Sequence, residues 1–204
     1  MNEEAKKIIE EMYGLGNRAE NCMSSLQTAF IYNSSKPLKD CYEAVDAVKS
    51  KEPELTRKVV ELTRGNPDLK PYITVPHHLL KIVENIEKLA NSIDKKIKDD
   101  VLFSDRAVTE TTFLLQRLSE ILKPAADIIL ARNVYLNRYV QESEAGIAKR
   151  ATDYATLHEE RLITGECLPV ASSLYINMLN AMKNIAWHAK EIASELAVWV
   201  RPKT

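Results

Sequence analysis

The chain has 204 residues, enough to bury a hydrophobic core in one large domain or in two small ones. Its 28 basic and 29 acidic residues give a formal net charge of -1, whereas a general nucleic-acid-binding protein normally carries a basic surplus. Only 5 Gly and 3 Phe occur among long tracts of Ala, Leu, Ile, Glu and Lys, a composition that favours helix over sheet. We therefore expect an all-α protein that does not bind nucleic acid.

The N-terminal residues begin acidic and lack the basic and apolar regions of a signal peptide. No stretch approaches the roughly 18 apolar residues of a membrane span. The three cysteines, Cys22, Cys41 and Cys167, lie far apart and form no Cys-x-x-Cys pair, so neither a disulfide framework nor a zinc site is expected. These features predict a cytoplasmic protein without a transmembrane segment.

Apolar residues recur at steps of three and four along the first part of the chain. This pattern predicts three helices, over residues 8–30, 38–62 and 77–98. Pro53 is expected to break or kink the second helix, because proline has no backbone N–H to donate. The segment 64–76 contains Gly65 and three prolines and is expected to form a loop.

The same periodicity predicts three further helices, over residues 104–129, 135–165 and 169–192. Ser104 or Asp105 can cap the first of them, and Pro124 should bend it. The next helix should end near Gly165, since glycine is favoured just after a helix, and Pro169 suits the first turn of the last one. The apolar positions of the middle helix are Tyr135, Tyr139, Ile147, Tyr154 and Leu157.

The chain thus has two successive sets of three predicted helices. An offset of 96 residues aligns the third helix with the sixth, so that Leu80 corresponds to Ile176 and Ile93 to Ala189. A fixed offset of this kind is typical of an internal repeat. We predict two tandem three-helix bundles, residues 1–102 and 103–204, that pack together as one globular unit.

The sequence contains no pattern that indicates catalysis. It has no Gly-x-Ser-x-Gly, no glycine-rich phosphate loop and no Glu-x-x-His of a di-iron bundle. His77 and His78 are adjacent and point about 100° apart on a helix, so capping or solvated roles are expected. His158 lacks the second histidine that a zincin helix would need. We therefore expect that the protein is not an enzyme.

The last helix carries the candidates for partner binding. Trp187 and Trp199 lie on it, and tryptophan is enriched in binding surfaces. His188 and Glu191 lie one turn apart and form either half of a metal site or an exposed polar pair. One face of this helix carries Asn177, Asn180 and Asn184. If this asparagine face is buried, it indicates a ligand between helices, and if it is solvated, it is only a polar surface.

The plan of two times three helices, in repeats of about 100 residues, resembles the PhoU family of phosphate-uptake regulators. The closest segments are residues 158–165 and 172–193, which resemble a helix pair with the signature Leu-Glu-Arg-Ile-Gly/Ala-Asp-His-Ala-x-Asn-Ile-Ala; residues 86–93 match more weakly. The resemblance implies a non-enzymatic, homodimeric regulator or adaptor that acts on a phosphate transporter or its sensor kinase at the inner face of the membrane. The alternative is a helical bundle that binds a small molecule or metal ion and has a drifted role.

The family's metal motif is an acidic residue followed four residues later by Asp, which places two carboxylates on one helical face. The corresponding positions are Glu87 and Asn91 in the first half and Lys183 and Trp187 in the second. Three of the four acids are therefore missing. The resemblance then implies no resident cofactor, no metal on the second half, and at most a weak divalent or transition-metal cation site at Glu87 and Asn91.

Overall fold

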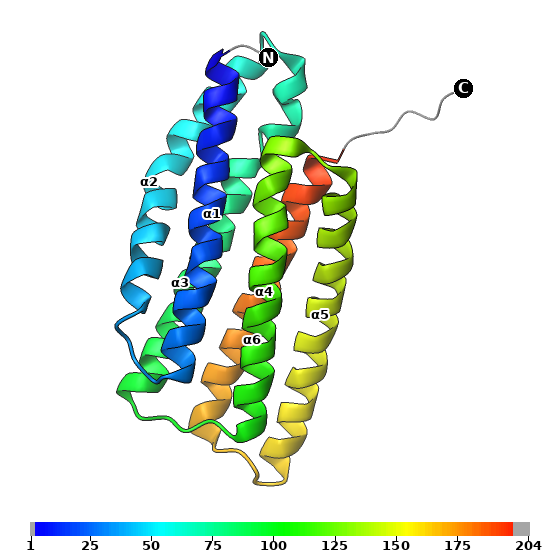
Figure 1. The fold of residues 1–204 in the computed structure, drawn as a ribbon. Coiled ribbons are helices and arrows are strands. Elements are labelled where there is room, and N and C mark those ends of the chain that lie inside the picture. Colours follow the sequence, from blue (N-terminus) through cyan, green and yellow to red (C-terminus); the bar gives the residue numbers. More distant parts are fainter. Residues whose placement is uncertain (1–2, 198–204) are drawn as a thin grey trace, which may run out of the picture.

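The computed structural model describes residues 3–197, and in it the chain forms an elongated bundle of long helices that run up and down (Figure 1). Its elements are α1 (Glu3–Ile31), α2 (Leu38–Thr63), a short 3-10 helix η1 (Pro67–Tyr72), α3 (Val75–Lys98), α4 (Asp105–Ala131), α5 (Val134–Ile163) and α6 (Pro169–Glu195). The all-α class and the six predicted helices are confirmed.

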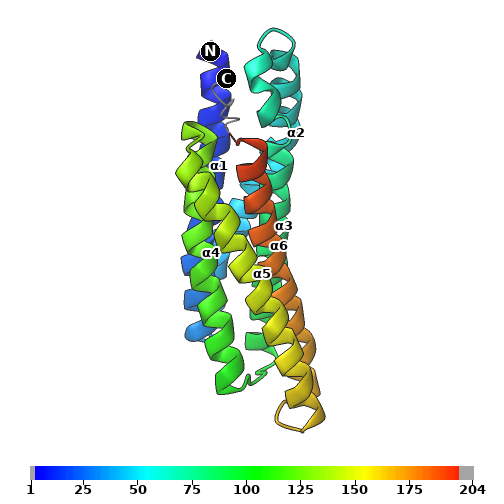
Figure 2. The ribbon, with the colours of Figure 1, turned by 90° about the vertical axis from the view of Figure 1, so that its right-hand side faces the viewer.

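The first three helices pack on one another, and so do the last three. The two halves meet where α1 packs on α4 and where α3 packs antiparallel on α6, while α2 and α5 lie on the outer sides (Figures 1 and 2). The boundary predicted between residues 102 and 103 falls in the connection between α3 and α4. One continuous hydrophobic core contains side chains from all six helices.

Local sequence explains where several helices begin and end. The Ser104 hydroxyl accepts a hydrogen bond from the backbone N–H of Ala107 at 3.3 Å, as a residue that caps α4 should. Asn133 caps α5 in the same way. Gly165 follows the end of α5 with a φ of 77°, the left-handed conformation that favours glycine.

Helix α2 continues through Pro53, so the break that the sequence allowed there is wrong, and α4 also continues through Pro124. A kink at Pro53 and a bend at Pro124 stay predictions. Pro53 is exposed, so the backbone carbonyl that loses its partner can be hydrated. The segment 64–76 is not a plain loop, because it contains η1 and the first residues of α3.

None of the helices within residues 3–197 is both long and apolar enough to span a membrane.

Candidate functional site

The exposed side of α6 lies between α3 and α5 and is bordered by a groove on each side. Asn184 lines both grooves. This side of the helix carries most of the residues singled out from the sequence, and we call it the α6 face.

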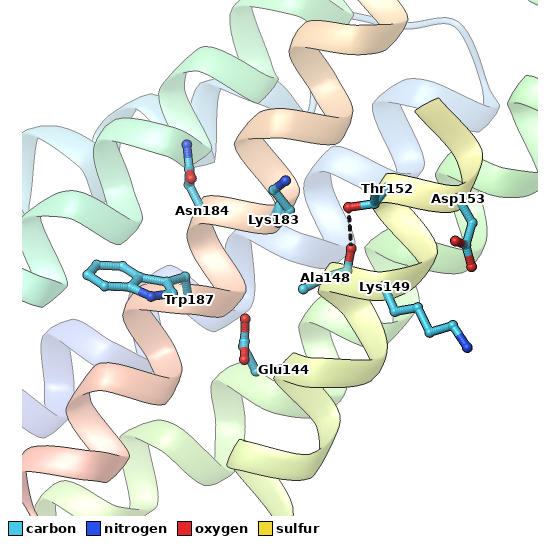
Figure 3. A pocket seen from close by; sticks show the side chains of 8 residues that line it. All are labelled: Glu144, Ala148, Lys149, Thr152, Asp153, Lys183, Asn184 and Trp187. Atoms are coloured by element: carbon cyan, nitrogen blue, oxygen red, sulfur yellow. Dashed lines mark hydrogen bonds between the residues drawn. The ribbon is translucent and has the colours of Figure 1, made fainter. Parts of the chain in front are cut away.

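The groove between α5 and α6 has a volume of about 480 Å³ (Figure 3). From α6 it is lined by Lys183, Asn184 and Trp187, and from α5 by Glu144, Ala148, Lys149, Thr152 and Asp153. Figure 3 shows the Glu144 side chain in the space between the two helices. The lining contains acidic side chains, basic side chains and one indole ring, so the groove could bind a polar partner segment with positive or negative charge.

The groove between α3 and α6 has a volume of about 410 Å³ and is rich in amides. Its lining includes Asn85, Asn91, Asn177, Asn180 and Asn184. The asparagine face of α6, which the sequence left open between a buried ligand site and a polar surface, is exposed at all three positions. It is therefore a polar surface, and it does not support a ligand enclosed between helices.

Glu87 and Asn91 lie on α3 and turn toward α2. The Glu87 carboxylate pairs with the Lys49 ammonium at 2.7 Å, and the Asn91 side-chain oxygen accepts a hydrogen bond from the Tyr42 hydroxyl at 2.9 Å. A lysine ammonium thus occupies the place beside Glu87 where a cation would have to bind. Burial raises the pKa of Tyr42, so its hydroxyl stays protonated and remains the donor.

On the second half, Lys183 and Trp187 line the groove between α5 and α6. Trp187 is 44% exposed, which is unusual for such a large apolar side chain. The Lys190 ammonium lies 5.4 Å from the centre of its ring. Among residues 3–197, no group of three or more His, Cys, Asp or Glu side chains is arranged to hold a metal ion.

His78 and His188 bring α3 and α6 together. Their Nδ1 atoms lie 3.1 Å apart, and the Trp187 ring packs edge-on against both imidazoles. His78 is only 8% exposed, so the capping or solvated role expected for it is wrong, whereas His77 is exposed as expected. Burial lowers the pKa of His188 to about 4, with the neighbouring His78 as the next cause, and burial also lowers the pKa of His78.

Glu191 follows His188 by one turn and is half-buried; its carboxylate pairs with the neighbouring Lys190 ammonium. Trp199, the remaining residue predicted to contact a partner, lies outside the described residues. The partner-binding role of these residues stays a prediction.

A group of polar residues buried between α4, α5 and α6 was not anticipated from the sequence. Arg161 pairs with Glu110 at 2.9 Å, and the Tyr175 hydroxyl donates to the same carboxylate. Beside them the His158 Nε2 and the Ser172 hydroxyl are 2.8 Å apart, but the other ring nitrogen of His158 has no hydrogen-bond partner among the described residues. A Ser–His pair without a third group to orient the imidazole is not a catalytic triad.

The sequence matches no known family model and no curated protein. The structure resembles the crystal structure of PhoU from Pseudomonas aeruginosa, with a TM-score of 0.73 over 95% of each chain. The chain has a PhoU-like fold. At 14% identity the likeness to PhoU concerns the fold, and the arrangement of two three-helix bundles expected from the sequence is confirmed by it.

Proposed function

We propose that the protein is a non-enzymatic, PhoU-like regulator or adaptor that acts on phosphate transport or its signalling. It would bind the cytoplasmic side of a membrane transporter or a sensor kinase. The observation that carries this proposal is the match of fold with PhoU over 95% of both chains.

The shape and surface of the molecule support a role in binding other proteins. Long rigid helices offer extended faces on which a partner helix can dock. The α6 face exposes Trp187 beside a groove of about 480 Å³, and tryptophan is among the residues that dominate binding energies. We propose this face as the surface that contacts the transporter or kinase.

The metal chemistry of the family is not part of the proposal. Lys49 pairs with Glu87, and in the second half Lys183 lies where the family's motif has a carboxylate, so each motif position has a lysine ammonium of the chain beside it or in it. A regulator with these residues would use protein contacts alone at the two motif positions. We propose that it forms a homodimer, with Trp199 as a contact.

The test is affinity purification of the tagged protein from native membranes under mild detergent. A subunit of a phosphate transporter or its sensor kinase should be enriched, and the enrichment should fall at least about tenfold with Trp187→Ala, as expected for a hot-spot residue. Tyr32→Ala, which removes an exposed aromatic side chain outside this face, serves as the matched control. Recovery of no transporter or kinase component, or equal recovery with both variants, would count against the proposal.

A further inference from the structure

A small pocket lies at the end of the molecule where α3 connects to α4 and α5 connects to α6 (Figures 1 and 2). Both connections contribute to its lining, with Leu102 and Phe103 from the first and Glu166 and Leu168 from the second. We call it the tip pocket. The regulatory role proposed above uses the α6 face and leaves this end of the bundle without a task.

The tip pocket is surrounded by exposed apolar side chains. Leu102 and Leu168 line it and yet are 73% and 60% exposed. Two other lining residues, Phe103 and Ala171, belong to a small apolar cluster beside the main core. A single exposed leucine is common on a protein surface, but two at one apolar pocket are typical of a site that a binding partner covers.

The volume of the tip pocket indicates which kind of group fits into it. Cofactors and drug-sized molecules occupy pockets of about 300–1,000 Å³, whereas an apolar cavity of about 150 Å³ takes up one benzene molecule. The tip pocket has a volume of about 220 Å³. It therefore suits one large aliphatic or aromatic side chain from another protein better than a cofactor.

The exposed charges at this end are mostly negative. Two helices end here and two begin, so their dipoles largely cancel. Exposed acidic side chains in the two connections and the adjoining helix ends are Asp99, Asp100, Asp105, Glu159, Glu160 and Glu166. The exposed basic side chains there are Lys95, Lys98 and Arg106. Since Lys95 pairs with Asp99 and Lys98 with Asp94, five carboxylates are opposed by Arg106 alone among these described residues.

We propose that the tip pocket binds a basic peptide segment of a partner protein and takes up one large apolar side chain of that segment. Burial of this side chain beside Leu102 and Leu168 supplies the hydrophobic contribution, and lysines or arginines next to it complement the carboxylates.

Cytoplasmic loops of membrane proteins carry an excess of Lys and Arg, so a loop of the transporter or kinase has the required chemistry. This choice of partner rests on the proposed function, whereas the chemistry of the segment rests on the tip pocket itself. An anionic lipid surface is the less suitable partner, because it attracts basic segments and repels carboxylates.

The first test is selection of peptides from a random library on the immobilised full-length protein, followed by affinity measurements in solution. The selected peptides should carry a net positive charge and one large apolar side chain. Leu168→Ser should weaken their binding by about tenfold or more, as expected when burial of a leucine is lost. Leu168 precedes α6 without a side-chain cap, and serine is favoured at this position, so the variant should fold. Val134→Ser, a change at a 53% exposed residue at the start of α5, is the matched control and should bind as the unchanged protein does.

A second measurement addresses the charge. Glu166→Lys should weaken binding of the selected peptides by about threefold or more at low salt, and the difference should shrink at about 0.5 M salt, where exposed charges are screened. Vesicles of phosphatidylglycerol and phosphatidylethanolamine should not sediment the protein.

The proposal is overturned if no peptide is selected, if the selected peptides are acidic or lack a large apolar side chain, or if Leu168→Ser binds them unchanged. Vesicle binding that Leu168→Ser abolishes would assign the tip pocket to a lipid surface and would also overturn it. If basic peptides bind as expected but native membranes yield no transporter or kinase component, the proposed function fails and the tip pocket stands.

Discussion

Single residues in this bundle show that a polar side chain can be buried when its partner is buried with it. Glu110, Arg161 and Tyr175 come from three helices, and the Glu110 carboxylate accepts hydrogen bonds from the other two inside the second half, while the Arg161 Nη1 has no partner among the described residues. Burial and the hydrogen bond to Glu110 raise the pKa of Tyr175, so that its hydroxyl stays a donor. Hydrophobic periodicity counts only apolar positions and therefore could not reveal this cluster.

This cluster gives a prediction about stability. Glu110→Leu should lower the free energy of unfolding by about 3–5 kcal/mol, because it leaves the Arg161 guanidinium buried without its counter-charge. The double variant Glu110→Leu/Arg161→Leu should recover most of this loss, since a buried pair can often be replaced by apolar residues at little cost. Urea unfolding followed by circular dichroism measures both values.

The exposed pair of Arg138 and Glu142 is the control, and Glu142→Ala should change the stability by less than about 1 kcal/mol. If the single Glu110 variant were no less stable than the Glu142 variant, the buried pair would have no structural importance.

The buried histidines predict a dependence of stability on pH. In the unfolded chain His188 titrates near 6.5, but burial and then His78 lower its pKa to about 4 in the folded protein. Between these values the unfolded state binds more protons than the folded state, so stability must fall as the pH drops from about 6.5 toward 4.

We expect the urea midpoint of the unchanged protein to fall more between pH 7.5 and pH 5 than that of His188→Gln, whose new side chain cannot be protonated. His77→Ala removes an exposed histidine nearby and should behave like the unchanged protein. An identical fall in all three proteins would show that other groups cause the pH dependence.

At the scale of the elements, the six α-helices could be predicted from the sequence. The periodic apolar positions and the residues that begin and end helices indicate the same segments. Helix α5 shows what this reasoning misses. Its expected apolar face includes Tyr135, which is 81% exposed, whereas the buried face carries His158 and Arg161. Since those polar residues are buried only through partners on other helices, the face of α5 could not be assigned from its own sequence.

The packing of α1 on α4 gives a prediction at this scale. Both Gly14 and Gly16 lie inside α1, where glycine costs about 0.5–1 kcal/mol relative to alanine. A Cβ on Gly14 would meet nothing within 4 Å, but one on Gly16 would lie 3.0 Å from the Cβ of Ala126 on α4. Gly14→Ala should therefore stabilise the protein by about 0.5–1 kcal/mol, whereas Gly16→Ala should stabilise less or destabilise.

Chemical denaturation of the two variants in parallel tests this expectation, and each serves as the other's control. If Gly16→Ala stabilised as much as Gly14→Ala, α1 and α4 would not be held as closely as the structure shows.

For the molecule as a whole, the sequence predicts that the candidate site residues lie on helices three and six. It does not predict which of these side chains contact one another. The contact of His78 with His188, and the pairing of Glu87 with Lys49, join residues that lie far apart in the chain. Such pairs depend on how whole helices are rotated and shifted against each other. The register of α3 against α6 therefore had to come from the structure.

The shared core predicts how the molecule unfolds. The halves are joined along α1–α4 and α3–α6, and the buried Tyr72 hydroxyl donates across the boundary to the carbonyl of Ile129 at 3.1 Å. Each half alone would expose these apolar faces to water and leave this carbonyl without its partner. We therefore expect fragments 1–102 and 103–204 to be largely unfolded when produced separately, and the full chain to unfold in one step.

In a Trp199→Phe background, the fluorescence of Trp187 reports on the second half, while circular dichroism reports on the helices of both. The two signals should give one urea midpoint, as expected for a two-state transition. Two separated midpoints, or a fragment with native helix content, would mean that each bundle folds on its own. The interface between α3 and α6, with its paired histidines, could then separate while both halves stayed folded.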